Sequence, residues 1–340
     1  MKRRDFLRLA SSACSGALVT VAAPKILRGQ GSLDKMTLLI GSAPPDPAIH
    51  YFYYAKMNGF YEQEGIDVTL KTFSAETTAL RGLLAGEGEV AWTGAVSTFQ
   101  AMDSGAKVKC ISAITSKLDW VVVANKSVAD LKQVAGKTFA VSQIGAASQI
   151  APILMLEGLG IGRDQIKWIA LGGSSSRVQA LVVNKIDVTM LTPSFAVRAL
   201  KEPNLHQIGD ASKDLSKFLL SLEIASSAAI ESKPKVLKAF VLGTARGALW
   251  GLQNPEQAAE LSQKILPDVP KDDLAAVLQL YARIKYWNAA AVLPRASFDF
   301  TYGSMARVGN IKINTPITYE DFFFDEFALA AATKLGLPTP

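Results

Sequence analysis

The chain has 340 residues, 49% of them apolar and 19% charged, which is an ordinary globular composition at a length that predicts about two domains. This composition excludes a disordered chain, a collagen and a coiled coil. Two cysteines, Cys14 and Cys110, and two histidines, His50 and His206, exclude a disulfide framework, a cysteine-based zinc cluster and a histidine-rich metal centre. We therefore expect no metal site.

The positive charge of the chain is concentrated at its N-terminus. Residues 1–30 hold six Lys or Arg and one Asp, so they contribute +5 of the formal net charge of +6. The remainder is nearly neutral, and we expect no nucleic-acid partner. The basic start is followed by the small and apolar run ASSACSGALVTVAA, which has the length of a secretory apolar region and is too short for a spanning helix.

The segment Arg3-Arg4-Asp5-Phe6-Leu7-Arg8 resembles a twin-arginine export signal. We therefore predict a signal peptide over residues 1–30, cleaved between 22 and 31, and a periplasmic mature protein. An amphipathic anchor and an ordinary basic start are the alternatives. Lipidation at Cys14 is disfavoured because Ser11-Ser12-Ala13 places no large aliphatic residue upstream. Cys110, in the apolar run VKCISAI, is interpreted as a buried core residue.

From residue 36 onward, short apolar runs alternate with helical periods. Strands are predicted at 37–42, 66–73, 89–93 and 108–114, with a long helical stretch to Tyr61 and another helix from Ala75. This alternation predicts an α/β fold with mostly parallel sheets covered by helices. In such sheets, ligands bind beyond the carboxyl ends of the strands.

An internal repeat predicts two lobes of similar architecture. The segment 73–94, shifted by 98 residues, falls on 171–192 and aligns Leu83 with Leu181, Val90 with Val188 and Glu89 with Asp187. Chance similarity of two βα units is the alternative. We predict lobe 1 from 33 to 123, lobe 2 from 124 to 221, and a return to lobe 1 with C-terminal helices over 222–340. The stretch from Trp120 to Ala124 is expected to cross between them.

Polar loops rich in Ser, Thr and Gly precede five predicted helices. They lie at residues 74–78, 93–97, 145–148, 172–176 and 192–194. A helix start offers free N–H groups and a positive dipole end, which bind anions and carbonyl oxygens. A single Ser-rich start is usually only an N-cap, but five of them at facing strand ends predict a ligand cleft.

Catalytic and cofactor motifs are not found in the sequence. There is no Gly-x-Ser-x-Gly elbow, Walker loop or His-Glu-x-x-His pattern. The run Gly158-Leu159-Gly160-Ile161-Gly162 follows a helix, so it indicates a helix end and not a dinucleotide loop. We expect no cofactor and no catalytic residue.

The segment PAIHYFYYAKMNGFYEQEGIDVTL (47–70) resembles the opening of bacterial solute-binding proteins of the nitrate/sulfonate/taurine type, which include binders of thiamine-pyrimidine precursors. The resemblance continues through ALRGLLAGEGEVAWTG and GGSSSRVQALVVNKIDV and covers residues 36–250. It implies a two-lobed periplasmic binding protein fold (type II). It also implies capture of a small solute by hinge closure and delivery to an ABC permease with a cytoplasmic ATPase.

Matching loop positions give the candidate ligand-binding residues Ser42, Asp46, His50, Tyr51, Ser74, Thr77, Thr93, Gly94, Trp120, Ser142, Ser148, Gly173, Ser174 and Thr192. Arg177 either pairs an anionic head group or is an exposed helix charge. Glu76, if it points inward, opposes an anion and favours an amine or a polar heterocycle. The solute classes left open are a sulfonate, nitrate, a carboxylate and a nitrogen heterocycle.

Two other functions stay open at the level of sequence. One is an exported enzyme related to thiamine-pyrimidine synthases, although the cysteine-rich motif of those enzymes has no counterpart here. The other is an exported sensor module that presents ligand state to a membrane receptor. The expected partners are the solute, the permease complex and the twin-arginine export machinery, and the expected state is a monomer.

Overall fold

The computed structural model describes residues 32–312 and 316–339. The description below concerns residues 33–340, which form one compact unit. The predicted twin-arginine signal and its cleavage region, with Cys14, lie outside the described residues. Among the helices that the structure describes, none combines the length and the apolar character needed to cross a bilayer.

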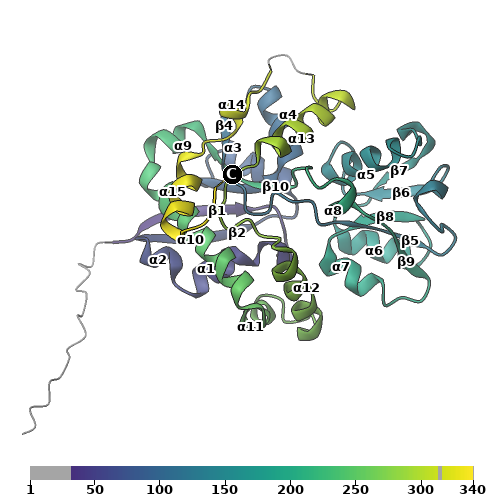
Figure 1. The fold of residues 1–340 in the computed structure, drawn as a ribbon, viewed down its shortest axis with the longest axis horizontal. Coiled ribbons are helices and arrows are strands. Elements are labelled where there is room, and N and C mark those ends of the chain that lie inside the picture. Colours follow the sequence, from purple (N-terminus) through teal and green to yellow (C-terminus); the bar gives the residue numbers. More distant parts are fainter. Residues whose placement is uncertain (1–31, 313–315, 340) are drawn as a thin grey trace, which may run out of the picture. The chain divides into compact units, whose positions relative to one another are not determined.

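The first sheet contains five strands in the order β2-β1-β3-β10-β4 (Figure 1). They are β1 (Asp34–Ile40), β2 (Ile66–Thr72), β3 (Val90–Gly94), β4 (Val108–Ser112) and β10 (Ser221–Ser226). Every residue of β3 is buried, as expected for a strand covered on both faces. The connecting helices are η1 (Pro47–Ile49), α1 (His50–Met57), α2 (Phe60–Gln63), α3 (Glu76–Leu84) and α4 (Ala95–Asp103).

The second sheet has the order β7-β6-β8-β5-β9. Its strands are β5 (Val121–Asn125), β6 (Thr138–Val141), β7 (Lys167–Ala170), β8 (Val188–Leu191) and β9 (Leu205–Asp210). Between them lie η2 (Leu131–Gln133), α5 (Ala147–Glu157), η3 (Arg163–Gln165), α6 (Ser174–Val182) and α7 (Pro193–Ala199), and α8 (Ala211–Asp214) follows β9. We refer to the elements that carry each sheet as the first and the second half.

The two halves share one topology, which confirms the internal repeat seen in the sequence. In each sheet one strand, β10 or β5, runs antiparallel to both of its neighbours, while the other pairs are parallel. Helix α3 shifted by 98 residues coincides with α6. One contact also recurs: Glu89 Oε2 accepts from the Thr37 amide at 2.7 Å, and Asp187 Oδ2 accepts from the Thr138 amide at 2.8 Å.

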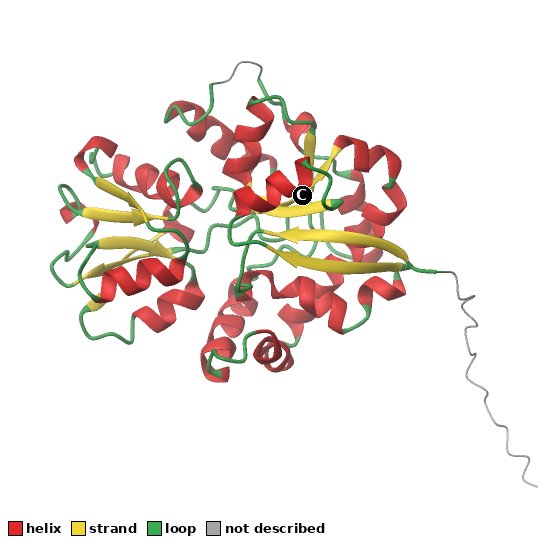
Figure 2. Ribbon diagram, turned by 180° about the vertical axis from the view of Figure 1, so that it is seen from behind, coloured by secondary structure: helices red, strands yellow, loops and turns green. Residues whose placement is uncertain are grey.

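The C-terminal part supplies helices and no further named strand in the described residues. It contains α9 (Ser227–Ser232), α10 (Pro234–Gln253), α11 (Pro255–Ile265), α12 (Lys271–Ile284), α13 (Arg295–Arg307), α14 (Tyr319–Phe322) and α15 (Glu326–Leu335). Helix α10 packs on α1 and α15, so it lies against the first half, and α12 also contacts α7 of the second half. Figure 2 shows helices on both faces of the sheets.

The predicted α/β architecture, two mostly parallel sheets flanked by helices, is therefore confirmed. Val121 begins a strand of the second sheet and Ser221 a strand of the first. The domain limits at 123/124 and 221/222 stay a prediction.

Candidate functional site

Each of the five polar segments marks a helix start, but the helices begin inside these segments and not after them. Helices α3, α4, α5, α6 and α7 begin at Glu76, Ala95, Ala147, Ser174 and Pro193. The loops belong to both halves, so the side chains that join them identify where the halves meet.

Asp46 links its own loop in the first half to the start of α7 in the second half. Its Oδ2 accepts hydrogen bonds from Thr192 Oγ1 at 3.0 Å and from Ser194 Oγ at 2.6 Å, at the start of α7. Its own loop is fixed because Oδ1 accepts from the Ala48 amide at 2.9 Å and the Asp46 amide donates to Ser42 Oγ at 3.2 Å. Burial raises the pKa of the Asp46 carboxyl in spite of these hydrogen bonds. We call Asp46, Thr192 and Ser194 the junction.

Glu76 lies at the start of α3, beside the start of α4. Its Oε1 accepts from Ser221 Oγ at 2.9 Å, and its backbone carbonyl accepts from Thr93 Oγ1 at 3.1 Å. A Cβ on Gly94 would lie 2.4 Å from Glu76 Oε2, so the absence of a side chain at Gly94 makes room for the carboxylate. Burial raises the pKa of Glu76 to about 7. Ser74 is exposed and Thr77 half-buried, and neither side chain makes a hydrogen bond to a described residue.

Asp119 and Trp120 lie in the segment that leads from β4 to β5. Asp119 Oδ2 accepts from the Tyr281 hydroxyl, 3.1 Å away, at the end of α12. Trp120 Nε1 is buried and has no hydrogen-bond partner among the described residues, whereas the Tyr286 hydroxyl interacts with the Asp119 carboxyl. Burial, with a smaller contribution from the charge of Asp46, raises the pKa of Asp119 to about 8. Asp119 is thus a buried carboxyl on which the charge of Asp46 acts.

His50 and Tyr51 are held inside the first half. His50 is fully buried, with Nδ1 2.7 Å from Ser262 Oγ and Nε2 3.3 Å from the Pro45 carbonyl oxygen. Burial lowers its pKa to about 3, so the imidazole is neutral at physiological pH. The Tyr51 hydroxyl donates to Glu223 Oε1 at 2.6 Å. The structure therefore does not bring either side chain to the junction.

Ser142, Ser148, Gly173 and Ser174 belong to loops of the second half. Ser148 Oγ accepts from the Ser142 amide at 2.9 Å and caps this loop. The following turn touches the first half, because the Gly145 carbonyl accepts from Gln100 at 3.4 Å and from Asn310 at 3.2 Å. Gly173 is exposed, and Ser174 Oγ accepts from Arg177 at 3.0 Å. Neither Gly173 nor Ser174 is bonded to the first half.

The expectation that Arg177 is an exposed helix charge is wrong. Its side chain is buried and donates to the carbonyl oxygens of Gly172 and Met190 and to the hydroxyl of Thr189. These acceptors satisfy the guanidinium within the second half, so Arg177 supports the loop before α6.

Four residues of this region were not singled out from the sequence: Asp119, Glu223, Ser194 and Ser221. A visible signal existed for Ser194, which lies in the polar loop 192–194, and for Glu223, which is a single carboxylate within the apolar strand SLEIAS. Its Oε2 accepts from the Ile114 amide at 3.4 Å, and burial raises its pKa to about 7. Asp119 lies in a connection without regular periodicity, so only the tertiary structure reveals its surroundings.

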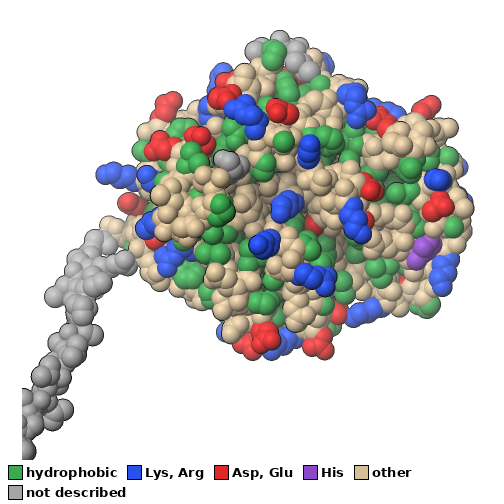
Figure 3. All heavy atoms as spheres, viewed as in Figure 1, with side chains coloured by type: hydrophobic (Ala, Val, Ile, Leu, Met, Phe, Trp, Pro, Cys, Tyr) green, Lys and Arg blue, Asp and Glu red, His purple; other side chains and the backbone are tan. Residues whose placement is uncertain are grey.

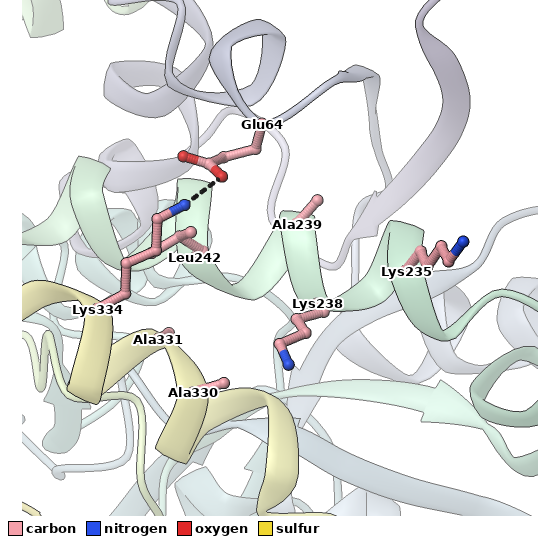
Figure 4. A pocket seen from close by; sticks show the side chains of 8 residues that line it. All are labelled: Glu64, Lys235, Lys238, Ala239, Leu242, Ala330, Ala331 and Lys334. Carbon is pink, nitrogen blue, oxygen red and sulfur yellow. Dashed lines mark hydrogen bonds and ion pairs between the residues drawn. The ribbon is translucent and has the colours of Figure 1, made fainter.

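Two surface pockets lie away from these loops. The first, of about 270 Å³, is lined by α10 and α15 with Glu64, whose carboxylate pairs with Lys334 at 2.9 Å (Figure 4). The second, of about 450 Å³, is lined mainly by residues around Gly105 and Ile317. Neither includes a predicted site residue.

Comparisons with known proteins agree with this architecture. A family model described as NMT1/THI5 like matches residues 46–258. The riboflavin-binding protein RibY of Chloroflexus aurantiacus is 23% identical over 287 residues, covering 82% of this chain and 81% of RibY.

Solved structures confirm the fold class. The periplasmic nitrate-binding protein NrtA from Synechocystis PCC 6803 superposes with a TM-score of 0.73 at 14% identity, covering 90% of each chain. The periplasmic aliphatic sulphonate binding protein SsuA from Escherichia coli gives a TM-score of 0.63 at 15% identity, covering 81% of this chain and 94% of SsuA. The chain therefore has the two-lobed periplasmic binding protein fold predicted from its sequence.

Proposed function

We propose that this chain, which belongs to the NMT1/THI5-like family, is the substrate-binding component of an ABC importer and captures a small organic solute between its two halves. The observation that carries the proposal is the junction, where one carboxylate of the first half accepts hydrogen bonds from two hydroxyls of the second. These bonds form only when the halves approach each other. A solute that touches both halves adds its own contacts to the same state and shifts the balance toward it.

The connections between the sheets supply a hinge for this closure. The chain passes between the halves over residues 113–120 and again over 211–220. The two segments are paired, because the amides of Leu220 and Ser221 donate to the carbonyls of Ser116 and Thr115 at 3.0 and 3.2 Å. A rotation about these paired segments moves one half against the other while both sheets stay intact.

Binding without chemistry fits the described side chains better than catalysis. The two histidines are the natural general bases at neutral pH. His50 is enclosed and neutral, and His206 lies on β9 near the Ala129 carbonyl. Neither is placed beside a hydroxyl or thiol at the junction. The proposal therefore assigns the junction a recognition role.

Export, periplasmic location and delivery to a permease complete the proposal. The twin-arginine pattern at residues 3–8 and the periplasmic location stated for NrtA and SsuA support it. The partners would then be the permease in the membrane and its cytoplasmic ATPase. The mature chain would act as a monomer.

A binding screen coupled to a shape measurement tests the proposal. Purified protein is screened by thermal shift against nitrate, alkanesulfonates, carboxylates and amino-heterocycles, and each stabilising solute is followed by small-angle X-ray scattering. We expect one solute class to raise Tm and to reduce the radius of gyration. The matched variants are Asp46→Ala, which should weaken binding, and Glu260→Ala on the exposed face of α11, which should not. An unchanged Tm across all four classes would contradict the proposal.

A further inference from the structure

The pocket between α10 and α15 has an apolar floor. Its volume is about 270 Å³, and the floor consists of Ala239, Leu242, Ala330 and Ala331. We call this pocket the tail groove. Three of the four floor residues are alanines, whose short side chains leave the space between the two helices open. Such a concave apolar surface can receive an anchoring side chain of a partner.

Two lysines on α10 line the tail groove without an anionic partner. In the described part of the chain, neither Lys235 nor Lys238 forms an ion pair with a carboxylate. The two residues are three positions apart on one helix face, so their charges repel each other. They also lie near the start of a 20-residue helix whose first turn holds no acidic residue, where the helix dipole disfavours cations. Carboxylates of a partner would offset both effects.

The acidic residue of the lining is already neutralised. Glu64 Oε1 pairs with Arg246 at 3.1 Å, and Glu64 Oε2 pairs with Lys334 at 2.9 Å. Figure 4 shows the ammonium group of Lys238 between α10 and α15, and that of Lys235 farther from Glu64 along α10. The tail groove therefore keeps an excess of positive charge. By contrast, Lys and Arg are interspersed with Asp and Glu over the face drawn in Figure 3.

Charge and shape together select the kind of occupant. Strand β1 starts beside the tail groove, because the Asp34 amide donates to the carbonyl oxygen of Gly65, the neighbour of Glu64, at 3.1 Å. The segment that precedes β1 carries a net charge of +5 over residues 1–30, so the lysines repel it. A flat lipid surface would meet the lysines but would leave the floor uncovered. A protein segment with carboxylates beside an apolar side chain matches both features.

We propose that the tail groove docks an acidic amphipathic segment of another protein. An apolar side chain of that segment enters the floor, and its carboxylates pair with Lys235 and Lys238. This interaction goes beyond solute capture, because α10 and α15 pack on the first half and the groove needs no closure of the two halves.

The probe is a fluorescein-labelled peptide in which Leu-Leu and Glu-Glu pairs alternate, and its binding to the purified protein is followed by fluorescence anisotropy. Lys235→Glu combined with Lys238→Glu should weaken binding about tenfold, because two attractive charge pairs become repulsive. Ala330→Leu fills the floor without changing the charge and should weaken binding several-fold. The matched control combines Lys126→Glu with Lys132→Glu, two exposed lysines of the second half, and should change binding less than about twofold.

Three outcomes would overturn the docking proposal. An equal loss in both double variants, with Ala330→Leu unchanged, would show a general attraction between peptide and protein. Binding to phosphatidylglycerol vesicles without binding of the peptide would assign the lysines to a lipid surface. Dimerisation in sedimentation, lost in the Lys235→Glu and Lys238→Glu double variant, would assign the groove to a second copy of this chain. None of these results bears on solute capture, which the thermal-shift screen tests separately.

Discussion

Helix α10 approaches α1 through a row of glycines, and replacing one of them should destabilise the first half. Gly243, Gly247 and Gly251 recur at every fourth position and therefore lie on one face of α10. At Gly247 an added Cβ would lie 2.3 Å from the Tyr51 carbonyl oxygen and 2.9 Å from the Ala55 amide nitrogen. Both atoms belong to the backbone of α1, so no side-chain rotation can relieve the clash.

The expected cost of Gly247→Ala follows from this geometry. Carbon and oxygen atoms pack at about 3.5 Å, so the two helices would have to separate locally by about 1 Å, and overpacking of this kind costs roughly 1–3 kcal/mol and occasionally more. The higher helix propensity of Ala offsets up to about 1 kcal/mol of this cost. Because backbone meets backbone here, we expect a net loss of about 2–3 kcal/mol in the free energy of unfolding.

Gly303→Ala on α13 is the matched control. Gly303 is also helical and exposed, and an added Cβ there meets no atom within 4 Å. This substitution should be neutral or should stabilise the protein by up to about 1 kcal/mol. Urea unfolding followed by tryptophan fluorescence measures both variants. If Gly247→Ala matched Gly303→Ala within about 0.5 kcal/mol, the approach of α10 to α1 would not be the constraint inferred here.

Three further predictions concern buried polar groups. The pKa of Asp119 (about 8) is above the ordinary 3.8, so the folded state binds more protons than the unfolded state between these pH values. As the pH rises through this window, the free energy of unfolding of the wild type therefore falls by up to about 1.4 kcal/mol per pH unit. Asp119→Asn should lose none of it, and parallel pH profiles of urea unfolding would contradict this. Tyr51→Phe removes the hydroxyl that donates to Glu223 and should cost about 1–3 kcal/mol, measured by the same unfolding assay, whereas an unchanged midpoint would show that the bond contributes little. Asp46→Ala should populate a more open state, visible as a larger radius of gyration, and an identical scattering curve would refute the closing role of the junction.

The local order of elements was readable from the sequence because it depends on short-range patterns. The internal repeat with an offset of 98 residues predicted the position of α6 from that of α3. The five polar loops predicted helix starts, which the structure confirms. Pro255 and Pro270 stand at the starts of α11 and α12, where proline is favoured because it fixes φ and lacks the N–H that a helix start does not need. Asp46 and Thr192 were chosen by loop position, and the structure joins them.

The environment of each side chain was decided only by the tertiary structure. His50 and Tyr51 open α1 beside a polar loop, but the close packing of α10 and α11 turns both of them into the core. Arg177 is buried because β8 offers it carbonyl and hydroxyl acceptors that lie 12 and 13 residues further along the chain. The pKa of Asp119 is raised first by burial and then by the charge of Asp46, which is distant in sequence. Hydrogen bonding and desolvation depend on which distant segments come into contact. The periodicity of the sequence carries no information about those contacts.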